Sequence, residues 1–211
     1  NVIRSIERCG LSVADVVLEP LASAEAILSE DEKEIGVAVI DIGGGTTDLM
    51  IYADGGICHT SVIPAGGNNI SSDVAAGLRT PMAEAERLKR QLGCALGRMI
   101  ADDEEMEVPG VGGHPPRRAA RRLLSDIIEP RVEEIFSEVR RRVEETGMLE
   151  QISSGCVLTG GAALMEGMVE CAEEVLGMPV RLGFPVGVRG IVQLVQGPQY
   201  ATGVGLVRYG A

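Results

Sequence analysis

The chain has 211 residues, 45% of them hydrophobic, so it is long enough to form one large or two small domains around a substantial core. A formal net charge of −12 at pH 7 argues against nonspecific binding to nucleic acid and against binding an anionic membrane through the whole surface. The five cysteines form no Cys-x-x-Cys pair and the two histidines are far apart, which indicates reduced thiols in a cytosolic protein and no metal site.

The first residues predict a helix that ends at Gly10, because Val2, Ile3 and Ile6 recur at helical spacing and glycine is a common C-cap. This pattern begins at the very start of the chain, which opens with Asn1 rather than methionine. We therefore expect the chain to be a fragment of a longer protein.

A short strand is expected at residues 16–18, followed by a helix from Glu19 to Leu28 in which Pro20 occupies the favoured first turn. Residues 30–34 are expected to form an acidic loop. At the end of its strand, Glu19 would face the crevice where ligands bind in α/β sheets, and it could orient the water that attacks a γ-phosphate. The alternative is an ordinary first-turn acid, which the helix dipole favours.

The most informative stretch comes next, where the apolar run from Ile35 to Ile40 predicts a buried strand. Three glycines, Gly43, Gly44 and Gly45, then force a tight turn, and without side chains their N–H groups can approach a ligand closely. Because a second strand is expected over residues 49–52, the glycine loop joins two strands in a hairpin. A P-loop or a dinucleotide-binding loop would lead into a helix instead.

Polar side chains flank this glycine loop. Thr46 and Thr47 add hydroxyl groups, while Asp41 and Asp48 add carboxylates that suit a hydrated Mg²⁺ ion beside phosphate oxygens. A strand–Asp-x-Gly-Gly-Gly-Thr–strand hairpin resembles the second phosphate loop of the actin and DnaK-type ATPase superfamily. The alternative is a glycine-rich β-turn in which the acids occur by chance.

A third strand over residues 56–63 is expected to complete an antiparallel meander, since the preceding Asp-Gly-Gly is a hairpin turn signal. After it, the pattern becomes mainly helical up to about residue 151. The expected helices begin at Asn69 or Ser71, at Thr80, and at about Arg117, the last of them running to Glu145. Pro130 is expected to kink or split that last helix.

The α/β pattern returns in the last sixty residues. A buried strand is expected at residues 156–158, then a glycine turn, and a second strand at 180–182 between helices at 164–176 and about 198–207. The sequence therefore predicts an α/β core made of residues 1–64 plus 152–211, with residues 65–151 inserted as a mainly helical subdomain.

Two further features could contact a nucleotide. Glu86 and Lys89 are three residues apart on one helix, so they share a face and could hold ribose hydroxyls and the adenine edge. The alternative is a surface ion pair of small energetic weight. Gly160, Gly161 and Ala162 end a strand and open a helix, where the backbone could lie flat against a purine or a phosphate near the positive helix end.

An arginine-rich segment stands out in this acidic chain. It comprises Arg117, Arg118, Arg121 and Arg122, and further arginines precede it at positions 79, 87 and 90. Such a cluster could dock an acidic or carboxylate-bearing peptide. A solvated helix face explains it equally well.

With these residues in view, the chain resembles the C-terminal half of the FtsA family of actin-like bacterial cell division proteins. The resemblance runs nearly end to end and includes both glycine loops, which the whole superfamily shares. The stretches more specific to this family are Val-Gly-Gly-His-Pro-Pro-Arg at residues 111–117 and Glu-Pro-Arg at residues 129–131.

The resemblance implies an actin-like, ribonuclease H-like core (subdomain IIA) carrying the insertion (IIB), with ATP and Mg²⁺ bound in the cleft between them. The nucleotide contacts that it implies are Gly43, Gly44, Gly45, Thr46, Thr47, Gly66, Glu86, Lys89, Gly160, Gly161 and Ala162. Asp41 and Asp48 would hold Mg²⁺ through water, and Glu19 and Asp41 would support hydrolysis.

The resemblance also implies partners. The insertion would bind the C-terminal tail of FtsZ, the tubulin-like ring protein, through Arg90 and Arg117, with Arg90 serving in place of the neighbouring Gln91. The full-length protein would form actin-like filaments at the inner face of the cell membrane at the division site. Its membrane anchor would be an amphipathic C-terminal helix, which we expect to lie beyond Ala211.

Two other function classes share the fold. An ATPase of the MreB filament type or the DnaK chaperone type would use Glu19 and Asp41 for hydrolysis, and a sugar kinase would need an aspartate base and a sugar pocket. The stretch from Gly93 to Pro116 favours the FtsA family. We expect at most weak hydrolysis of ATP, and no activity from the isolated half.

Overall fold

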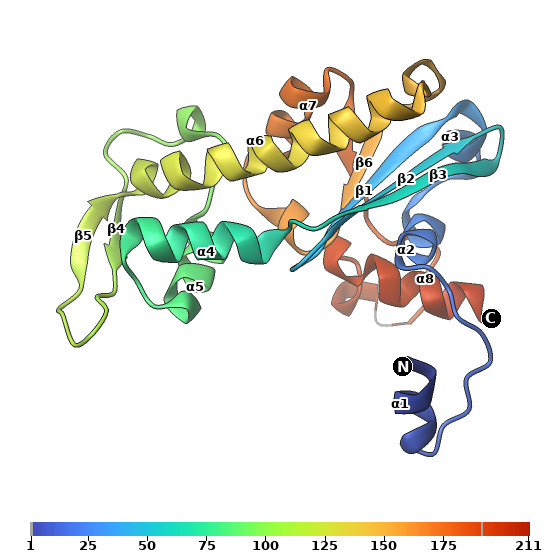
Figure 1. Cartoon of the computed structure of the whole chain (residues 1–211), viewed down its shortest axis with the longest axis horizontal. Coiled ribbons are helices and arrows are strands. Elements are labelled where there is room, and N and C mark those ends of the chain that lie inside the picture. The colour runs from blue at the N-terminus through green and yellow to red at the C-terminus, as the bar shows by residue number, and fades with distance from the viewer. Residues whose placement is uncertain (1, 191) are drawn as a thin grey trace.

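The computed structural model describes residues 2–190 and 192–211. Its centre is a five-stranded mixed sheet in the order β3-β2-β1-β6-β7 (Figure 1). The strands are β1 (Val37–Ile42), β2 (Thr47–Ala53), β3 (Gly56–Ile63), β6 (Cys156–Thr159) and β7 (Val180–Leu182). β1, β2 and β3 form the predicted antiparallel meander, and β6 lies parallel to β1. The predicted α/β fold class is therefore confirmed.

β1 and β2 are buried along their whole length because helices cover both faces of the sheet. Alternate residues of β1 enter different cores: Ala38, Ile40 and Ile42 pack on one face, and Val37 and Val39 on the other. Continuous apolar runs are typical of strands that are buried in this way. The sheet thus fixes the position of the glycine loop that follows β1.

The second face of the sheet is covered by two helices that contact each other closely, α2 (Glu19–Ile27) and α8 (Ala201–Tyr209). α2 begins with Pro20 in its first turn, as the sequence predicts. The opposite face is covered by α6 (Arg121–Thr146) and α7 (Met168–Leu176). In Figure 1 these two pairs lie on opposite sides of the sheet.

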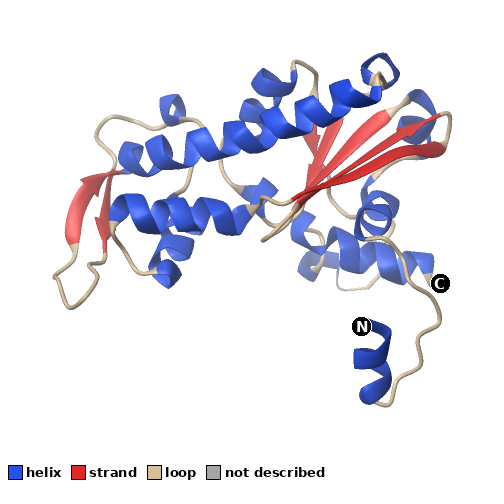
Figure 2. Cartoon of the chain, viewed as in Figure 1, coloured by secondary structure: helices blue, strands red, loops and turns tan. Residues whose placement is uncertain are grey.

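The insertion contains α4 (Gly67–Leu78), α5 (Met82–Leu92) and the first part of α6. It also contains a two-stranded antiparallel sheet, β4 (Glu105–Val108) and β5 (Arg117–Ala120), which the sequence analysis missed. Figure 2 shows this small sheet at the end of the insertion farthest from the main sheet. Its strands have only four residues each, and the charged residues around them hide the alternation that leaves Met106 and Val108 buried.

Several predicted helix bounds are wrong for identifiable reasons. α6 begins at Arg121 rather than Arg117, because residues 117–120 pair with β4. Pro130 lies inside α6 and does not split it, since buried side chains before and after it, Ile128 and Val132 among them, hold the helix in place. α4 begins at Gly67 rather than at Asn69 or Ser71, and the Asn69 side chain instead accepts a hydrogen bond from Gly66 N–H at 3.0 Å.

Two predictions near the N-terminus are also wrong. Residues 30–34 form a helix, α3 (Glu30–Ile35), because Ser29 and Glu32 cap it reciprocally: each side chain accepts the other's backbone N–H. Residues 16–18 form no strand, since no described strand pairs with them; Val16 and Leu18 are 67% and 62% exposed.

The remaining elements are short. α1 (Val2–Arg8) has no buried residues and stands apart from the sheet in Figure 1. Single 3-10 turns occur at Gly97–Met99, Leu149–Gln151, Ala162–Leu164, Val192–Leu194 and Pro198–Tyr200. Among the described residues, no helix is both long enough and apolar enough to cross a membrane.

α6 connects the insertion to the core. It contacts α4 at its first half, whereas α7 and β3 pack against it toward the main sheet. Phe136, near the middle of the helix, is fully buried in the same apolar cluster as Leu124 of the insertion end and Leu158 of β6. One apolar core therefore runs through both parts, while the boundary at residue 151 stays a prediction.

Replacing Phe136 with alanine is expected to lower the free energy of unfolding by about 3–5 kcal/mol, because it removes a fully buried ring and leaves a cavity. The matched control on the same helix is Leu123→Ala, whose side chain is exposed and which should change stability by about 0.5 kcal/mol or less. Urea denaturation of both variants measures the difference. Equal losses would contradict a core that is continuous through α6.

Candidate functional site

The glycine loop lies between β1 and β2, as predicted. Asp41 and Asp48 are direct partners in the antiparallel ladder, so both carboxylates arise at the base of the loop. The loop closes on itself through a hydrogen bond of 2.9 Å from Gly43 N–H to the Thr46 carbonyl. Four residues then turn the chain back, which is the hairpin geometry that the sequence indicates.

The start of α4 supports the glycine loop from behind. Gly67 N–H donates to the Gly43 carbonyl at 2.9 Å, and Asn68 N–H donates to the Gly44 carbonyl at 2.7 Å. A Cβ atom at Gly66 would lie 2.8–3.0 Å from the carbonyl oxygens of Gly43, Gly44 and Thr46. Glycine is therefore required at position 66 for close backbone packing, and this residue holds the loop.

The second glycine turn follows β6, whose Thr159 pairs with Asp41 of β1. Gly160 has a φ of +88°, and a Cβ atom there would lie 2.5 Å from both the Asp41 carboxylate and the Ile42 carbonyl. Both the left-handed backbone and the lack of space require glycine. This turn packs the end of β6 directly against the base of the first loop.

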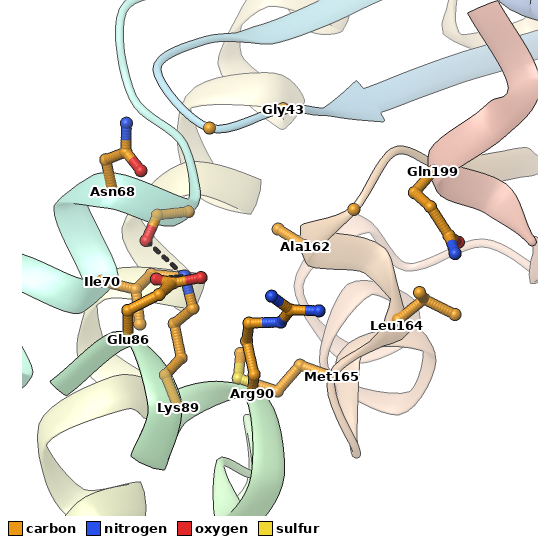
Figure 3. Close-up of a pocket in the computed structure, with 13 residues that line it drawn as sticks. Gly43, Asn68, Ile70, Glu86, Lys89, Arg90, Ala162, Leu164, Met165 and Gln199 are labelled. Atoms are coloured by element: carbon orange, nitrogen blue, oxygen red, sulfur yellow. Dashed lines mark hydrogen bonds and ion pairs between the residues drawn. The ribbon is translucent and has the colours of Figure 1, made fainter. Parts of the chain in front are cut away.

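The two glycine turns and helix α5 enclose a cleft of about 360 Å³ (Figure 3). Its lining residues come from five separate segments of the chain. They are Gly43, Gly44, Gly67, Asn68, Ile70, Glu86, Lys89, Arg90, Gly161, Ala162, Leu164, Met165 and Gln199. The structure thus brings the first loop, the second loop and the Glu86–Lys89 pair to one cavity.

Some of the predicted nucleotide contacts lie elsewhere. Gly45 and Thr46 are exposed beside the cleft, and Gly66 and Gly160 are packed beneath the two loops. Thr47 is fully buried, and its hydroxyl donates to the Ala65 carbonyl at 2.8 Å. None of these five residues lines the cleft.

The sequence analysis missed several lining residues. Leu164 and Met165 follow the second glycine turn and form an apolar wall, and Gln199 reaches the rim from the turn before α8. Asn68 directly follows the glycine pair Gly66-Gly67, and this pair was the sequence signal that could have identified Asn68 as a lining residue. No local pattern pointed to Gln199, which reaches the cleft only through packing of the C-terminal segment.

Glu86 and Lys89 form a connected network with Ser71 of α4. Lys89 Nζ lies 2.7 Å from Glu86 Oε2, and the Ser71 hydroxyl also donates to that carboxylate. Partial burial acts to raise the pKa of Glu86, but hydrogen bonds from Lys89 and Ser71 outweigh it and hold the pKa below its usual value. Glu86 is therefore ionised, and Lys89 is buried rather than solvated as in an ordinary surface pair.

Arg90 was predicted as a contact for a partner protein, and the structure places it in the wall of the cleft. In Figure 3 its guanidinium group points into the open space between Lys89 and Ala162. Its neighbour on the same helix, Arg87, faces outward and pairs with Glu84. Arg90 thus presents a positive charge to whatever occupies the cleft.

Asp41, at the end of β1 below the glycine loop, is buried. Burial raises the pKa of its carboxyl to about 6; the negative charges of Glu19 and Asp48 add to the rise, and a hydrogen bond from Ser23 at 2.6 Å opposes it. Glu19, the first residue of α2, is exposed and close enough to act on Asp41. Burial likewise raises the pKa of Asp48, against a hydrogen bond from Thr46.

These acids do not form a preassembled metal cage. Within residues 2–190 and 192–211, no three histidine, cysteine or acidic side chains converge to hold an ion directly. Asp41 and Asp48 instead share one end of the ladder, beneath the glycine loop. That arrangement fits a hydrated Mg²⁺ ion that keeps its waters, which is the usual state of magnesium beside phosphate groups.

The arginine-rich segment is largely neutralised. Arg118 pairs with Glu105, Arg122 with Asp102, and Arg121 with both Glu104 and Glu166. Arg117, at the start of β5, is exposed and donates to the Leu78 carbonyl at 3.1 Å. Arg117 is therefore the member of this segment whose charge no described carboxylate neutralises.

Comparison with known proteins gives a consistent picture. The family profile described as "Cell division protein FtsA" matches residues 38–205. The chain is 48% identical over its whole length to the cell division protein FtsA of Pseudomonas aeruginosa, covering 50% of that protein. It is 43% identical to that of Escherichia coli K12, covering 52%, and 43% identical to that of Bacillus subtilis, covering 46%. The chain thus spans about half the length of these curated relatives.

Solved structures share the fold. The MreB5 protein of Spiroplasma citri bound to ADP superposes with a TM-score of 0.79 at 19% identity, over 99% of this chain and 63% of that one. The PilM–PilN type IV pilus biogenesis complex contains a chain that superposes at a TM-score of 0.72 and 21% identity, over 99% of this chain and 56% of that one. The fold is therefore that of actin-like proteins.

The raised pKa of Asp41 predicts a pH-dependent stability. Between pH 4 and pH 6 the folded protein retains a proton that the unfolded chain releases, so the free energy of unfolding falls as pH rises through this range. Relative to Asp41→Asn, the wild type should lose up to about 3 kcal/mol between pH 4 and pH 8. Ser23→Ala should move the transition to higher pH. If the difference in the free energy of unfolding between wild type and Asp41→Asn were the same at every pH, the raised pKa of Asp41 would be contradicted.

Proposed function

Because the chain belongs to the FtsA family of cell division proteins, we propose that it is the nucleotide-binding and partner-binding half of an actin-like protein that links the FtsZ ring to the cell membrane. Family membership and the actin-like fold support a role in cell division. The proposed ligand and partner are argued from the residues of the cleft and of the insertion. Residues 65–151 would form subdomain IIB, and residues 1–64 and 152–211 would form subdomain IIA.

The proposed ligand of the cleft is ATP. The observation that carries this proposal is a cavity that joins two glycine turns to the free guanidinium group of Arg90. Gly43 and Gly44 would let backbone groups approach phosphates, and Gly161 and Ala162 would lie against the nucleoside. The ionised Glu86 would accept hydrogen bonds from ribose hydroxyls. The structural relative MreB5 is itself bound to ADP, which fits this ligand class.

Mg²⁺ would accompany the nucleotide and offset the charge of its phosphates. Asp41 and Asp48 would hold the ion through water, and Glu19 would orient a water toward the terminal phosphate. A cation beside the buried Asp41 carboxylate would favour its ionised form and so oppose the rise in its pKa. We propose hydrolysis that is weak at most. The alternative is an ATPase of the MreB filament or DnaK chaperone type, in which Glu19 and Asp41 support hydrolysis.

The proposed partner is the acidic or carboxylate-bearing C-terminal tail of FtsZ, docked on the insertion. Arg117 supports this proposal because it is exposed at the end of the small sheet and carries an unneutralised charge. Self-association into actin-like filaments and location at the division site are proposed for the full-length protein, on family membership alone.

Nucleotide binding is tested by calorimetric titration of the chain with ATP and Mg²⁺. Arg90→Ala should weaken binding about tenfold or more, because a charged hydrogen bond to the ligand is lost. Arg87→Ala is the matched control on the same helix; Arg87 is paired with Glu84 outside the cleft, and its removal should change affinity by about twofold or less. Equal effects of the two changes would argue against a nucleotide in this cleft.

Docking of the FtsZ tail is tested by fluorescence anisotropy with a labelled peptide of the last fifteen or so residues of FtsZ. Arg117→Glu should weaken binding about tenfold, and rising salt should weaken it in the wild type. Arg118→Glu is the control, since Arg118 is also exposed but is paired with Glu105. A peptide that binds the Arg117→Glu variant as tightly as the wild type would exclude this surface.

A further inference from the structure

Helix α2 presents two polar side chains to Asp41. Glu19 and Ser23 are four residues apart on this helix, so they lie on the same face. The Ser23 hydroxyl is fully buried and donates to Oδ2 of Asp41 at 2.6 Å, while Glu19 acts on the same carboxylate through its charge. Ser23 is therefore in direct contact with the buried acid, although it does not line the cleft.

A second hydroxyl, that of Thr202 on α8, supports Ser23. The two hydroxyl oxygens are 2.9 Å apart. A serine hydroxyl carries one proton, and Ser23 gives that proton to Asp41. Thr202 must therefore be the donor in its hydrogen bond with Ser23. The two hydrogen bonds run in one direction, from Thr202 through Ser23 to the carboxylate.

Close packing of α2 against α8 brings the two hydroxyls together. A Cβ atom at Gly205 would lie 1.7 Å from the Ala22 carbonyl oxygen, so glycine is required for the helices to approach this closely. Ala22 directly precedes Ser23, and Gly205 lies three residues after Thr202 on the same side of α8. The backbone contact next to the hydroxyls therefore sets their positions.

The two oxygens of the Asp41 carboxylate have different surroundings. Oδ2 accepts the hydrogen bond from Ser23. Oδ1 lies beside the second glycine turn, where a Cβ atom at Gly160 would come within 2.5 Å of it. Oδ1 accepts no hydrogen bond from any described residue, and it is not one of the fully buried polar atoms that lack a partner, so it keeps contact with solvent. Oδ1 is therefore the oxygen that is available to a water molecule.

We propose that Ser23 and Thr202 are positioning residues that hold Oδ2 of Asp41 and so leave Oδ1 free for the waters of a Mg²⁺ ion bound with the nucleotide. The inference rests on the proposed function, which places that hydrated ion beside Asp41. Hydrogen bonds to a carboxylate that serves a metal fix its orientation, and losing one commonly lowers metal affinity about 10–100-fold. Neither hydroxyl lines the cleft, so their loss should affect the metal rather than the nucleotide.

The first experiment measures the affinity for ATP by calorimetry, once with Mg²⁺ and once with EDTA. The ratio of the two dissociation constants gives the contribution of the metal to binding. Ser23→Ala should lower that ratio about tenfold and leave the affinity in EDTA unchanged, because Asp41 loses its hydrogen bond. A purely structural role for Ser23 predicts an equal loss of affinity under both conditions. An unchanged ratio would therefore overturn the proposal.

Matched variants of two threonines guard against misfolding. Thr202→Val keeps the shape of the side chain but removes its hydroxyl, and it should lower the ratio by a smaller factor than Ser23→Ala. Thr202→Ser keeps the hydroxyl and should retain the wild-type ratio. Thr159→Val should also retain it, because the buried Thr159 hydroxyl donates to the Pro198 carbonyl at 3.1 Å rather than to Asp41. Equal ratios for Thr202→Val and Thr202→Ser would overturn the role of Thr202.

The second experiment needs no nucleotide. At about pH 8, above the pKa of Asp41, the carbon-13 resonance of its carboxyl group reports the hydrogen bond that Oδ2 accepts. Ser23→Ala and Thr202→Val should shift this resonance, whereas Thr202→Ser and Thr159→Val should leave it in place. A resonance that none of these variants shifts would overturn the proposal.

The two experiments separate failure of the inference from failure of the proposed function. If the wild-type chain binds no ATP, or gains no affinity from Mg²⁺, the proposed function fails, and the Asp41 resonance still decides whether the two hydroxyls hold the carboxylate. If ATP binding depends on Mg²⁺ and the ratio is independent of Ser23, the proposed function stands and the positioning role is rejected.

Discussion

Two backbone hydrogen bonds hold the insertion against the core sheet at the point where the cleft forms: those from Gly67 and Asn68 N–H to the carbonyls of Gly43 and Gly44. The first amides of a helix have no partner within the helix and commonly bind an anion directly. Here they are used to fix a neighbouring loop. The proposed phosphate site is therefore the loop itself, and α4 acts as its support. Most other features of the site, from the glycine positions to the Lys89 network, follow from this contact.

The close approach of three backbone segments explains which glycines are indispensable. Gly66 packs on three carbonyl oxygens of the first loop, and Gly160 packs on the Asp41 carboxylate and the Ile42 carbonyl. Gly45, by contrast, has open space where a Cβ atom would be. Glycines that look alike in the sequence thus have different roles: some leave space for packing, and others, such as Gly43 and Gly44, line the cleft.

Charge is distributed unevenly around the cleft. Two buried acids, Asp41 and Asp48, lie at the foot of the glycine loop, where burial raises their pKa values. The opposite wall carries Lys89, which pairs with Glu86, and Arg90, which faces the open space. A ligand that combines phosphate groups with a divalent cation complements both ends. The arginine-rich segment adds little positive charge to the cleft, because Arg118, Arg121 and Arg122 are paired with carboxylates.

The sequence by itself determined the β1–β2–β3 meander, the helix beginning at Glu19 and the second glycine turn. These follow from hydrophobic periodicity and glycine turns, which are local properties of the chain. Local patterns could not reveal the small sheet at residues 105–120, whose strands are too short to show a clear period. Only the tertiary structure decided that Arg90 faces the cleft, that Gln199 reaches its rim and that Lys89 is buried in contact with Ser71 and Glu86. These placements depend on how residues far apart in the sequence pack together. The apolar core shared by α6 and the sheet sets the distances between the elements and the directions in which their side chains point.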